Sequence, residues 1–278
     1  MNSKESKLKA KEILSGCKNQ LILATFVSLL IPALVSVLLT ITGIATKSIL
    51  VLLVVSLAML IWQRGVVFSI TKMYIAKKNG EEIETFGFLR DSINELKRAW
   101  SITFSMIPKF IVPILLYIVS MVLTIVGTVA SFFSSNLGVS ALIPIVSLIL
   151  MIVICVISIR LSYQYRYADI EAICNPDLTS REVVNRTGEI MEGNRFKSFK
   201  LDLSFFLWAF VLGFLAGLVS GIIPILEPFA TALVFAIVQV SLMMAHIVFY
   251  ESLSGFASAD VFPEYIRDKD VEPDPFKY

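Results

Sequence analysis

Long apolar runs separated by polar segments dominate the pattern of this chain. A helix needs about 20 apolar residues to cross the hydrocarbon core of a bilayer, and an open strand cannot cross because its backbone groups would go unpaired. Six runs are long enough, over residues 21–42, 48–75, 102–129, 139–163, 203–223 and 229–250. The pattern therefore predicts an all-α, polytopic membrane domain over residues 20–254, with six transmembrane helices in a bundle.

The spacing between the runs groups the six predicted helices into three hairpins. Short breaks follow the first, third and fifth runs, whereas long polar segments separate the second run from the third and the fourth from the fifth. The first run is too long for the apolar region of a secretory signal peptide, and a second run follows it directly. We therefore expect the first run to remain in the protein as a membrane helix.

An amphipathic segment precedes each predicted hairpin. Apolar residues recur at helical spacing within residues 1–19, within residues 86–100 and within residues 179–191. The third segment begins with Thr179 and Glu182, which have the spacing of a capping box. Such periodicity is typical of helices that lie on a surface with the apolar face down. That surface is either the bilayer interface or the cytoplasmic ends of the membrane helices.

Basic residues gather on one side of the predicted membrane helices. Of the 24 Lys and Arg residues, 21 lie in the N-terminal segment, the two long connections and the C-terminal tail. The opposite side has only Lys47, while Arg64 and Lys109 fall within predicted helices. Cytoplasmic loops carry the excess of Lys and Arg, so both termini are predicted to be cytoplasmic. Residues 255–278, rich in Asp, Glu and Pro, are predicted to be a cytoplasmic, partly disordered tail.

Composition agrees with a membrane protein. Hydrophobic residues make up 56% of the chain and charged residues 17%, with a mean hydropathy of +0.81, whereas a soluble domain carries about 25% charged residues. The net charge of +2 is too small to indicate a nucleic-acid partner. Cys17, Cys155 and Cys174 form no C-x-x-C motif. Because Cys17 and Cys174 are predicted to be cytoplasmic, we expect neither a disulfide framework nor a structural zinc site.

Several short motifs resemble those of a known family. They are Ala10-Lys11 through Leu14 and Gly16, Asn79-Gly80-Glu81-Glu82 before Phe86, Met191-Glu192-Gly193-Asn194-Arg195, Phe199-Lys200-Leu201-Asp202-Leu203-Ser204-Phe205, Trp208, and Phe249-Tyr250-Glu251. In these motifs the chain is similar to an uncharacterised family of bacterial integral membrane proteins, domain of unknown function 975. It departs from the family pattern at Cys17-Lys18 and at Pro228-Phe229. The resemblance implies a six-helix fold in a bacterial cell membrane, and it implies no activity and no functional residues.

A few polar side chains in the predicted helices are candidates for a polar pathway or for interhelical contacts: Gln63, Arg64, Arg160, Gln239 and His246. An ionisable group inside a membrane helix is a functional hypothesis by default. Arg64, however, lies about 24 Å from the outer edge of its helix, where its side chain can extend to the inner interface. For Gln239, the most deeply placed, we favour an interhelical hydrogen bond over a solute contact. His246, the only histidine, is interpreted as structural.

The inner end of the fourth predicted helix carries a group of charged and aromatic residues. They are Arg160, Tyr163, Tyr165, Arg166, Tyr167 and Asp169. We interpret this group as an interfacial anchor, with a substrate-gating cluster as the alternative.

Small residues recur at every fourth position of the fifth predicted helix, at Ala209, Gly213, Gly217 and Gly221. Small side chains on one face allow helix backbones to approach closely. We therefore predict a helix-packing seam there, with a cavity-lining role as the alternative.

Two functions remain open from the sequence. The first is transport or export of a small solute, peptide or lipid, or assistance to a transporter. The second is a non-transporting interaction or organising module that binds anionic lipid or a partner protein. No nucleotide-binding GxxxxGK[ST] motif, no HExxH motif and no carboxylate cluster at membrane depth occurs in the chain, so we predict a non-enzymatic protein without a cofactor.

The expected partners are the lipid bilayer, with anionic lipid at the cytoplasmic face, and either another membrane protein or a second copy of the chain. A water-accessible cavity that reaches Arg64 or Gln239 would favour transport. Tightly packed helices with an exposed apolar flank would favour the interaction module.

Overall fold

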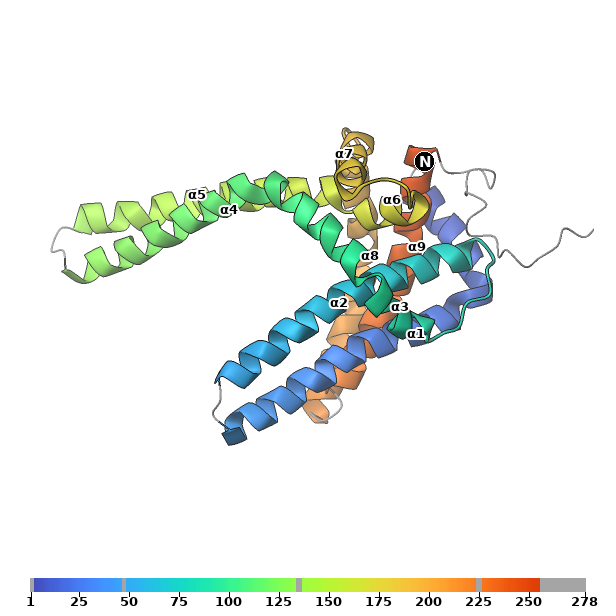
Figure 1. Cartoon of the computed structure of the whole chain (residues 1–278). Helices are drawn as coiled ribbons and strands as arrows, with labels where there is room; N and C mark the ends of the chain where they lie inside the picture. Colours follow the sequence, from blue (N-terminus) through green and yellow to red (C-terminus); the bar gives the residue numbers. More distant parts are fainter. Residues whose placement is uncertain (1–2, 47–48, 134–136, 224–226, 256–278) are drawn as a thin grey trace, which may run out of the picture.

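A computed structural model describes residues 3–46, 49–133, 137–223 and 227–255, and within these residues the chain is helical and without strands (Figure 1). The helices are α1 (Ser3–Thr46), α2 (Ile49–Lys78), α3 (Gly87–Asn94), α4 (Leu96–Phe133), α5 (Leu137–Tyr165), α6 (Ala168–Cys174), α7 (Ser180–Ile190), α8 (Arg195–Ile222) and α9 (Glu227–Ser254). Six of them, α1, α2, α4, α5, α8 and α9, are long and apolar enough to cross a membrane. The prediction of an all-α protein with six membrane helices is confirmed. The predicted tail, apart from Gly255, lies outside the described residues.

The amphipathic segments differ in how they join the membrane helices. Residues 3–19 continue into the first membrane helix as one helix, α1, with no proline between them. The second segment is divided at Glu95, so that its first part is α3 and its last residues begin α4. The third segment is a separate helix, α7, and the predicted capping box is present at Thr179 and Glu182.

The helices meet in one packed region, which we call the hub: α3, α6 and α7 together with the adjoining ends of the six long helices. Its core includes large side chains from distant parts of the chain, among them Leu21, Tyr74, Phe88, Tyr167 and Tyr250, each at most 2% exposed. A second buried cluster joins α2, α4 and α5 to α6 and α7 and includes Phe68 of α2, Ile102 of α4 and Val183 of α7. The hub therefore connects all three hairpins.

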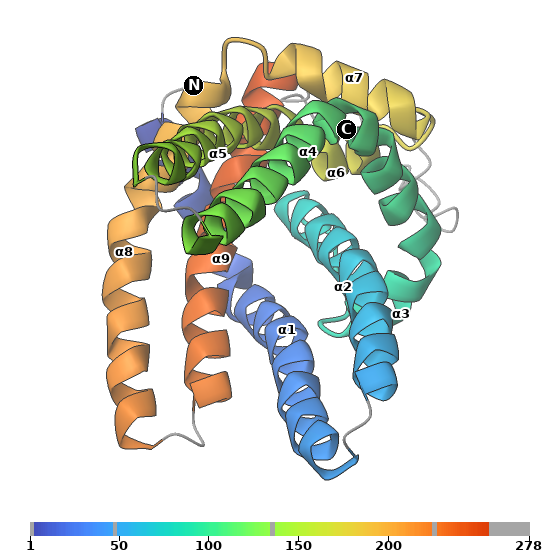
Figure 2. The same cartoon turned by 90° about the vertical axis from the view of Figure 1, so that its left-hand side faces the viewer.

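Beyond the hub the three hairpins diverge (Figures 1 and 2). The α4–α5 hairpin extends away from the other four long helices, and α4, which contains Pro108 and Pro113, bends along its course. Its two helices are joined by hydroxyl groups: Ser147 Oγ lies 2.5 Å from Thr124 Oγ1 and 3.3 Å from Ser120 Oγ. Most other side chains of this hairpin are apolar and exposed, such as Val122 (52%) and Ile149 (58%).

Gly65 marks a close approach between α2 and α3. A Cβ atom at this position would overlap the backbone oxygen of Ser92 and would lie 3.1 Å from Leu96 Cδ1. Trp62 Nε1 donates a hydrogen bond to Ser92 Oγ at 3.1 Å in the same contact. The absence of a side chain at Gly65 therefore allows α3 to pack on α2.

We expect Gly65→Ala to lower the free energy of unfolding by about 1–3 kcal/mol, because α3 must move away from α2. Gly213→Ala is the matched control, since a Cβ atom there meets nothing within 4 Å and alanine is the better helix former. The measurement is the midpoint temperature of unfolding in detergent, followed by circular dichroism. Equal midpoints for the two variants would contradict the tight contact.

Candidate functional site: a polar network in the hub

His246 of α9 connects two other parts of the hub. Its ring is buried, with Nδ1 2.7 Å from Tyr167 Oη and Nε2 2.7 Å from Asp202 Oδ1. Tyr167 Oη also lies 2.7 Å from Ser198 Oγ. With a neutral ring whose Nε2–H donates to Asp202, Nδ1 accepts from the Tyr167 hydroxyl, which in turn accepts from Ser198. Every polar atom of this chain of hydrogen bonds then has a partner.

Asp202, near the start of α8, accepts hydrogen bonds from three side chains. Besides His246, Tyr163 Oη donates to its carboxylate at 2.6 Å, and Arg166 forms an ion pair with it. Tyr163 lies on α5 and Arg166 directly follows that helix. A single carboxylate, 22% exposed, therefore ties α8 to both α5 and α9.

Glu171 of α6 is the centre of the second half of the network and is fully buried. Its carboxylate accepts from Tyr250 Oη at 2.8 Å and from Asn175 Nδ2 at 2.7 Å, and Arg186 of α7 lies 2.8 Å away. The rings of Tyr250 and Tyr167 stack with centroids 4.9 Å apart. This stack joins the Glu171 half of the network to the His246 half.

Two further ion pairs hold α2 in the hub. Arg64 donates to both carboxylate oxygens of Asp169, at 2.6 and 2.7 Å, and its Nε donates to Thr103 Oγ1 at 2.7 Å. Lys78, at the end of α2, forms a partly buried ion pair with Glu251 of α9. These contacts connect α2 with α4, α6 and α9.

The turn between α7 and α8 places Asp202 in the network. Gly193 has a φ of +78°, in the left-handed region that favours glycine. Asn194 Nδ2 donates to the backbone oxygen of Ile190 at 3.1 Å, while its Oδ1 accepts from Lys197 Nζ at 2.9 Å. The Gly193-Asn194 part of the distinctive motif is therefore a turn that fixes the direction of α8.

The capping box at the start of α7 carries a perturbed carboxyl group outside the membrane helices. Hydrogen bonds from the side chain and backbone of Thr179 lower the pKa of Glu182. Because the folded-state pKa is lowered, this contribution to stability is present above the ordinary glutamate pKa and is lost as the pH falls through the lowered value.

The five polar residues singled out in the sequence fall into two groups. Arg64 and His246 lie in the network, on contacts between helices. Gln63, Arg160 and Gln239 are exposed, and no hydrogen bond links them to the described residues. The interhelical contact of Gln239 therefore stays a prediction.

The small residues of α8 face open space. A Cβ atom at Gly213, Gly217 or Gly221 would meet nothing within 4 Å, and Ala209 is half-buried. Among the described residues no helix packs against the three glycines. The packing seam therefore stays a prediction, and it would need a helix of another molecule as its partner.

Sequence reasoning did not identify Asp202, Glu171 or Tyr250 as network residues, although it noted the group around Tyr167. Asp202 and Glu171 each stand between apolar residues, in Leu201-Asp202-Leu203 and in Ile170-Glu171-Ala172. A single carboxylate with apolar neighbours on both sides is a signal of a paired, buried charge. Their partners lie too far along the chain to be recognised from spacing.

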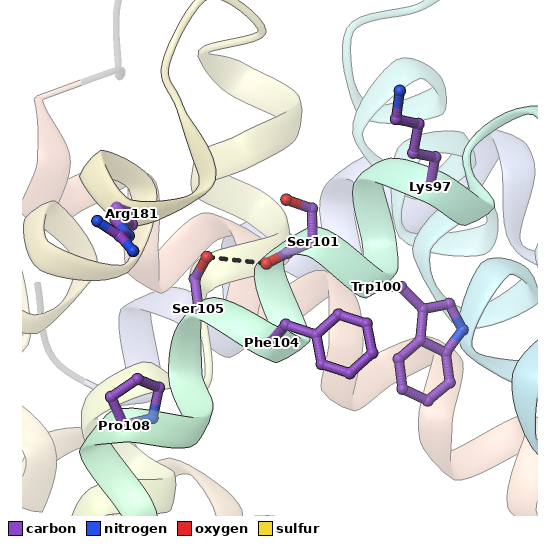
Figure 3. Close-up of a pocket in the computed structure, with 7 residues that line it drawn as sticks. All are labelled: Lys97, Trp100, Ser101, Phe104, Ser105, Pro108 and Arg181. Carbon is purple, nitrogen blue, oxygen red and sulfur yellow. Dashed lines mark hydrogen bonds between the residues drawn. The ribbon is translucent and has the colours of Figure 1, made fainter.

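A cleft of about 500 Å³ opens at the edge of the hub, between α4 and α7 (Figure 3). It is lined by Lys97, Trp100, Ser101, Phe104, Ser105 and Pro108 of α4 and by Arg181 of α7. Figure 3 shows Lys97 and Arg181 on opposite sides of the two serines, with the rings of Trp100 and Phe104 close together. Two cations with hydroxyl and aromatic side chains suit the headgroup region of an anionic membrane.

Comparison with known proteins gives one match. The family described as "Protein of unknown function (DUF975)" matches residues 1–257. No curated protein and no solved structure matches the chain. The family match covers the whole described structure, including all nine helices given above. The chain therefore belongs to this family of proteins of unknown function.

Proposed function

We propose that the protein is a non-enzymatic interaction module of the bacterial cell membrane, with both termini in the cytoplasm and its basic hub held against anionic lipid. One observation supports the proposal: two of the three ionisable candidates for a polar pathway, Arg64 and His246, are held by other side chains of the hub. Arg64 is bound to Asp169, and His246 lies between Tyr167 and Asp202. Polar groups that bind a transported solute must be available to it.

The distribution of charge supports the choice of anionic lipid as the partner. Nearly all of the basic residues, 21 of 24, lie on the side that the sequence assigns to the cytoplasm. Each Lys or Arg near an anionic membrane surface contributes about 1 kcal/mol of attraction. The exposed apolar flanks of the diverging hairpins supply the complementary contact with acyl chains.

The proposal is tested by purifying the full chain in a mild detergent and identifying the bound lipids by mass spectrometry. We expect anionic phospholipid to be enriched over its share in the source membrane and to raise the midpoint of thermal unfolding more than phosphatidylcholine does. In liposomes loaded with carboxyfluorescein, we expect no release that depends on the protein. Equal effects of anionic and zwitterionic lipid, or protein-dependent movement of the dye, would overturn the proposal.

Transport or export of a lipid is the second candidate. It is favoured by a groove of about 840 Å³ beside α1, whose walls combine lysine with apolar side chains. A fluorescent-lipid translocation assay in liposomes separates the candidates, because a transporter moves labelled lipid between the leaflets and a static module does not.

A further inference from the structure

The groove beside α1 has one polar wall and one apolar wall. The polar wall is formed by Lys7, Lys11, Lys18 and Asn19 of α1. The apolar wall is formed by Phe205, Trp208 and Leu212 of α8 and by Ile237 and Val238 of α9. In Figure 2, α9 lies between α8 and α1, and it packs against both. The volume of about 840 Å³ is in the range of small-molecule binding sites.

The lysines of the groove differ in their contacts. Lys7 Nζ donates to the backbone oxygen of Ser204 at 2.8 Å and lies 4.4 Å from the centre of the Phe205 ring. Lys11 and Lys18 are exposed, and neither forms an ion pair within the described part of the chain. They stand seven residues apart, which places them on the same face of α1 two turns from each other. Both are therefore available to an anion.

The groove extends into the membrane-spanning part of the fold. The Lys7–Ser204 hydrogen bond sets the level of α1 against α8. From there the lining residues continue to Gln20, so the groove follows α1 for about 20 Å. Over this length it passes Trp208 and Leu212, which lie in the apolar run of α8. Trp208 is 66% exposed. The two unpaired lysines thus lie opposite a surface suited to hydrocarbon.

We propose that this groove binds one anionic phospholipid, with the phosphate between Lys11 and Lys18 and an acyl chain along Phe205, Trp208 and Leu212. The inference rests on the proposed function and gives it a specific site. Charge complementarity requires an anionic group, and the apolar wall requires that the same ligand carry a hydrocarbon chain. A free phosphate satisfies only the first requirement, and a neutral lipid only the second.

The test measures binding to the full chain in detergent by native mass spectrometry. The probes are phosphatidylglycerol, phosphatidylcholine with the same acyl chains, and glycerol 3-phosphate. We expect phosphatidylglycerol to bind much more tightly than the other two. Lys11→Gln with Lys18→Gln should weaken its binding about 30-fold, from about 1 kcal/mol for each lysine. Lys11→Arg with Lys18→Arg should retain binding, and Trp208→Ala should weaken it without affecting glycerol 3-phosphate.

The matched control is Lys9→Gln with Arg90→Gln, which removes the same charge from exposed positions outside the groove. Equal losses in the control and in the groove variant would show attraction to the general surface charge and would overturn the site, while the proposed function would stand. Glycerol 3-phosphate binding as tightly as phosphatidylglycerol would overturn the role of the apolar wall. If phosphatidylcholine and phosphatidylglycerol bind equally, both the site and the proposed function are wrong.

Discussion

Asp202→Ala is expected to lower the free energy of unfolding by about 2–4 kcal/mol, somewhat below the effect of removing one partner from a fully buried charged contact, because Asp202 is 22% exposed. The substitution leaves three donors without their acceptor: Tyr163, Arg166 and the imidazole of His246. These groups lie on or next to α5 and α9, so the attachment of α8 to both helices is weakened. The measurement is the unfolding midpoint in detergent by circular dichroism, with the free energy from denaturant titration.

Asp177→Ala is the control for this prediction, because Asp177 is exposed and has no ion pair among the described residues. It should change stability by no more than about 0.5 kcal/mol. A double-mutant cycle of Asp202→Ala with His246→Ala then isolates the contact between the two side chains. Additive effects would mean that His246 and Asp202 do not interact in the folded protein.

Arg64→Ala is expected to lower the free energy of unfolding by about 2–3 kcal/mol. This loss is somewhat below the value for a fully buried pair, because Arg64 and Asp169 are each 19% exposed. The variant loses both hydrogen bonds to Asp169 and the one to Thr103. Arg64→Lys should be intermediate, since lysine keeps the charge but cannot form the two parallel hydrogen bonds. The same thermal and denaturant measurements apply.

When Asp169 is removed together with Arg64, the loss of stability should be smaller than the sum of the two single losses. In Arg64→Ala with Asp169→Ala no unpaired carboxylate remains, so the double variant should be more stable than the sum of the single effects indicates. Arg160→Ala, an exposed arginine, serves as the control and should be nearly neutral. If Arg64→Ala leaves stability unchanged but alters solute movement in liposomes, the proposed non-transporting role is wrong.

The membrane helices could be predicted from the sequence because their signal is local. Four of the six apolar runs lie inside one helix each, and the run at 203–223 ends one residue beyond α8. The run at 48–75 begins outside the described residues and continues through α2. The capping box at Thr179 and Glu182 identified the start of α7. The helices are longer than the runs since the polar residues at their ends, such as those from Arg195 to Asp202, continue the same helix. Hydropathy locates the hydrocarbon-spanning part and not the whole helix.

The network could not be predicted because its contacts join distant positions. Tyr167 and His246 are 79 residues apart, and Arg64 and Asp169 are 105 residues apart. Arg64 lies in the middle of α2, whereas the sequence analysis expected its side chain to extend to the inner interface. Hydropathy alone could not identify its carboxylate partner. The divergence of the α4–α5 hairpin likewise depends on contacts between distant helices in the hub. The local spacing of apolar residues does not specify such contacts.

The close packing of α1 against α9 has a consequence for biosynthesis. Leu21 and Ala24 of α1 are buried in a core that also requires Val240 and Met244 of α9. Translation proceeds at about 5–20 residues per second, so roughly 10–40 s separate the synthesis of the two helices. Until α9 is made, the face of α1 that packs on α9 lacks this neighbour, although α2 is already present beside α1. The first hairpin of the nascent chain must therefore wait in the membrane, accessible to lipid or to an insertion factor, before the hub can close.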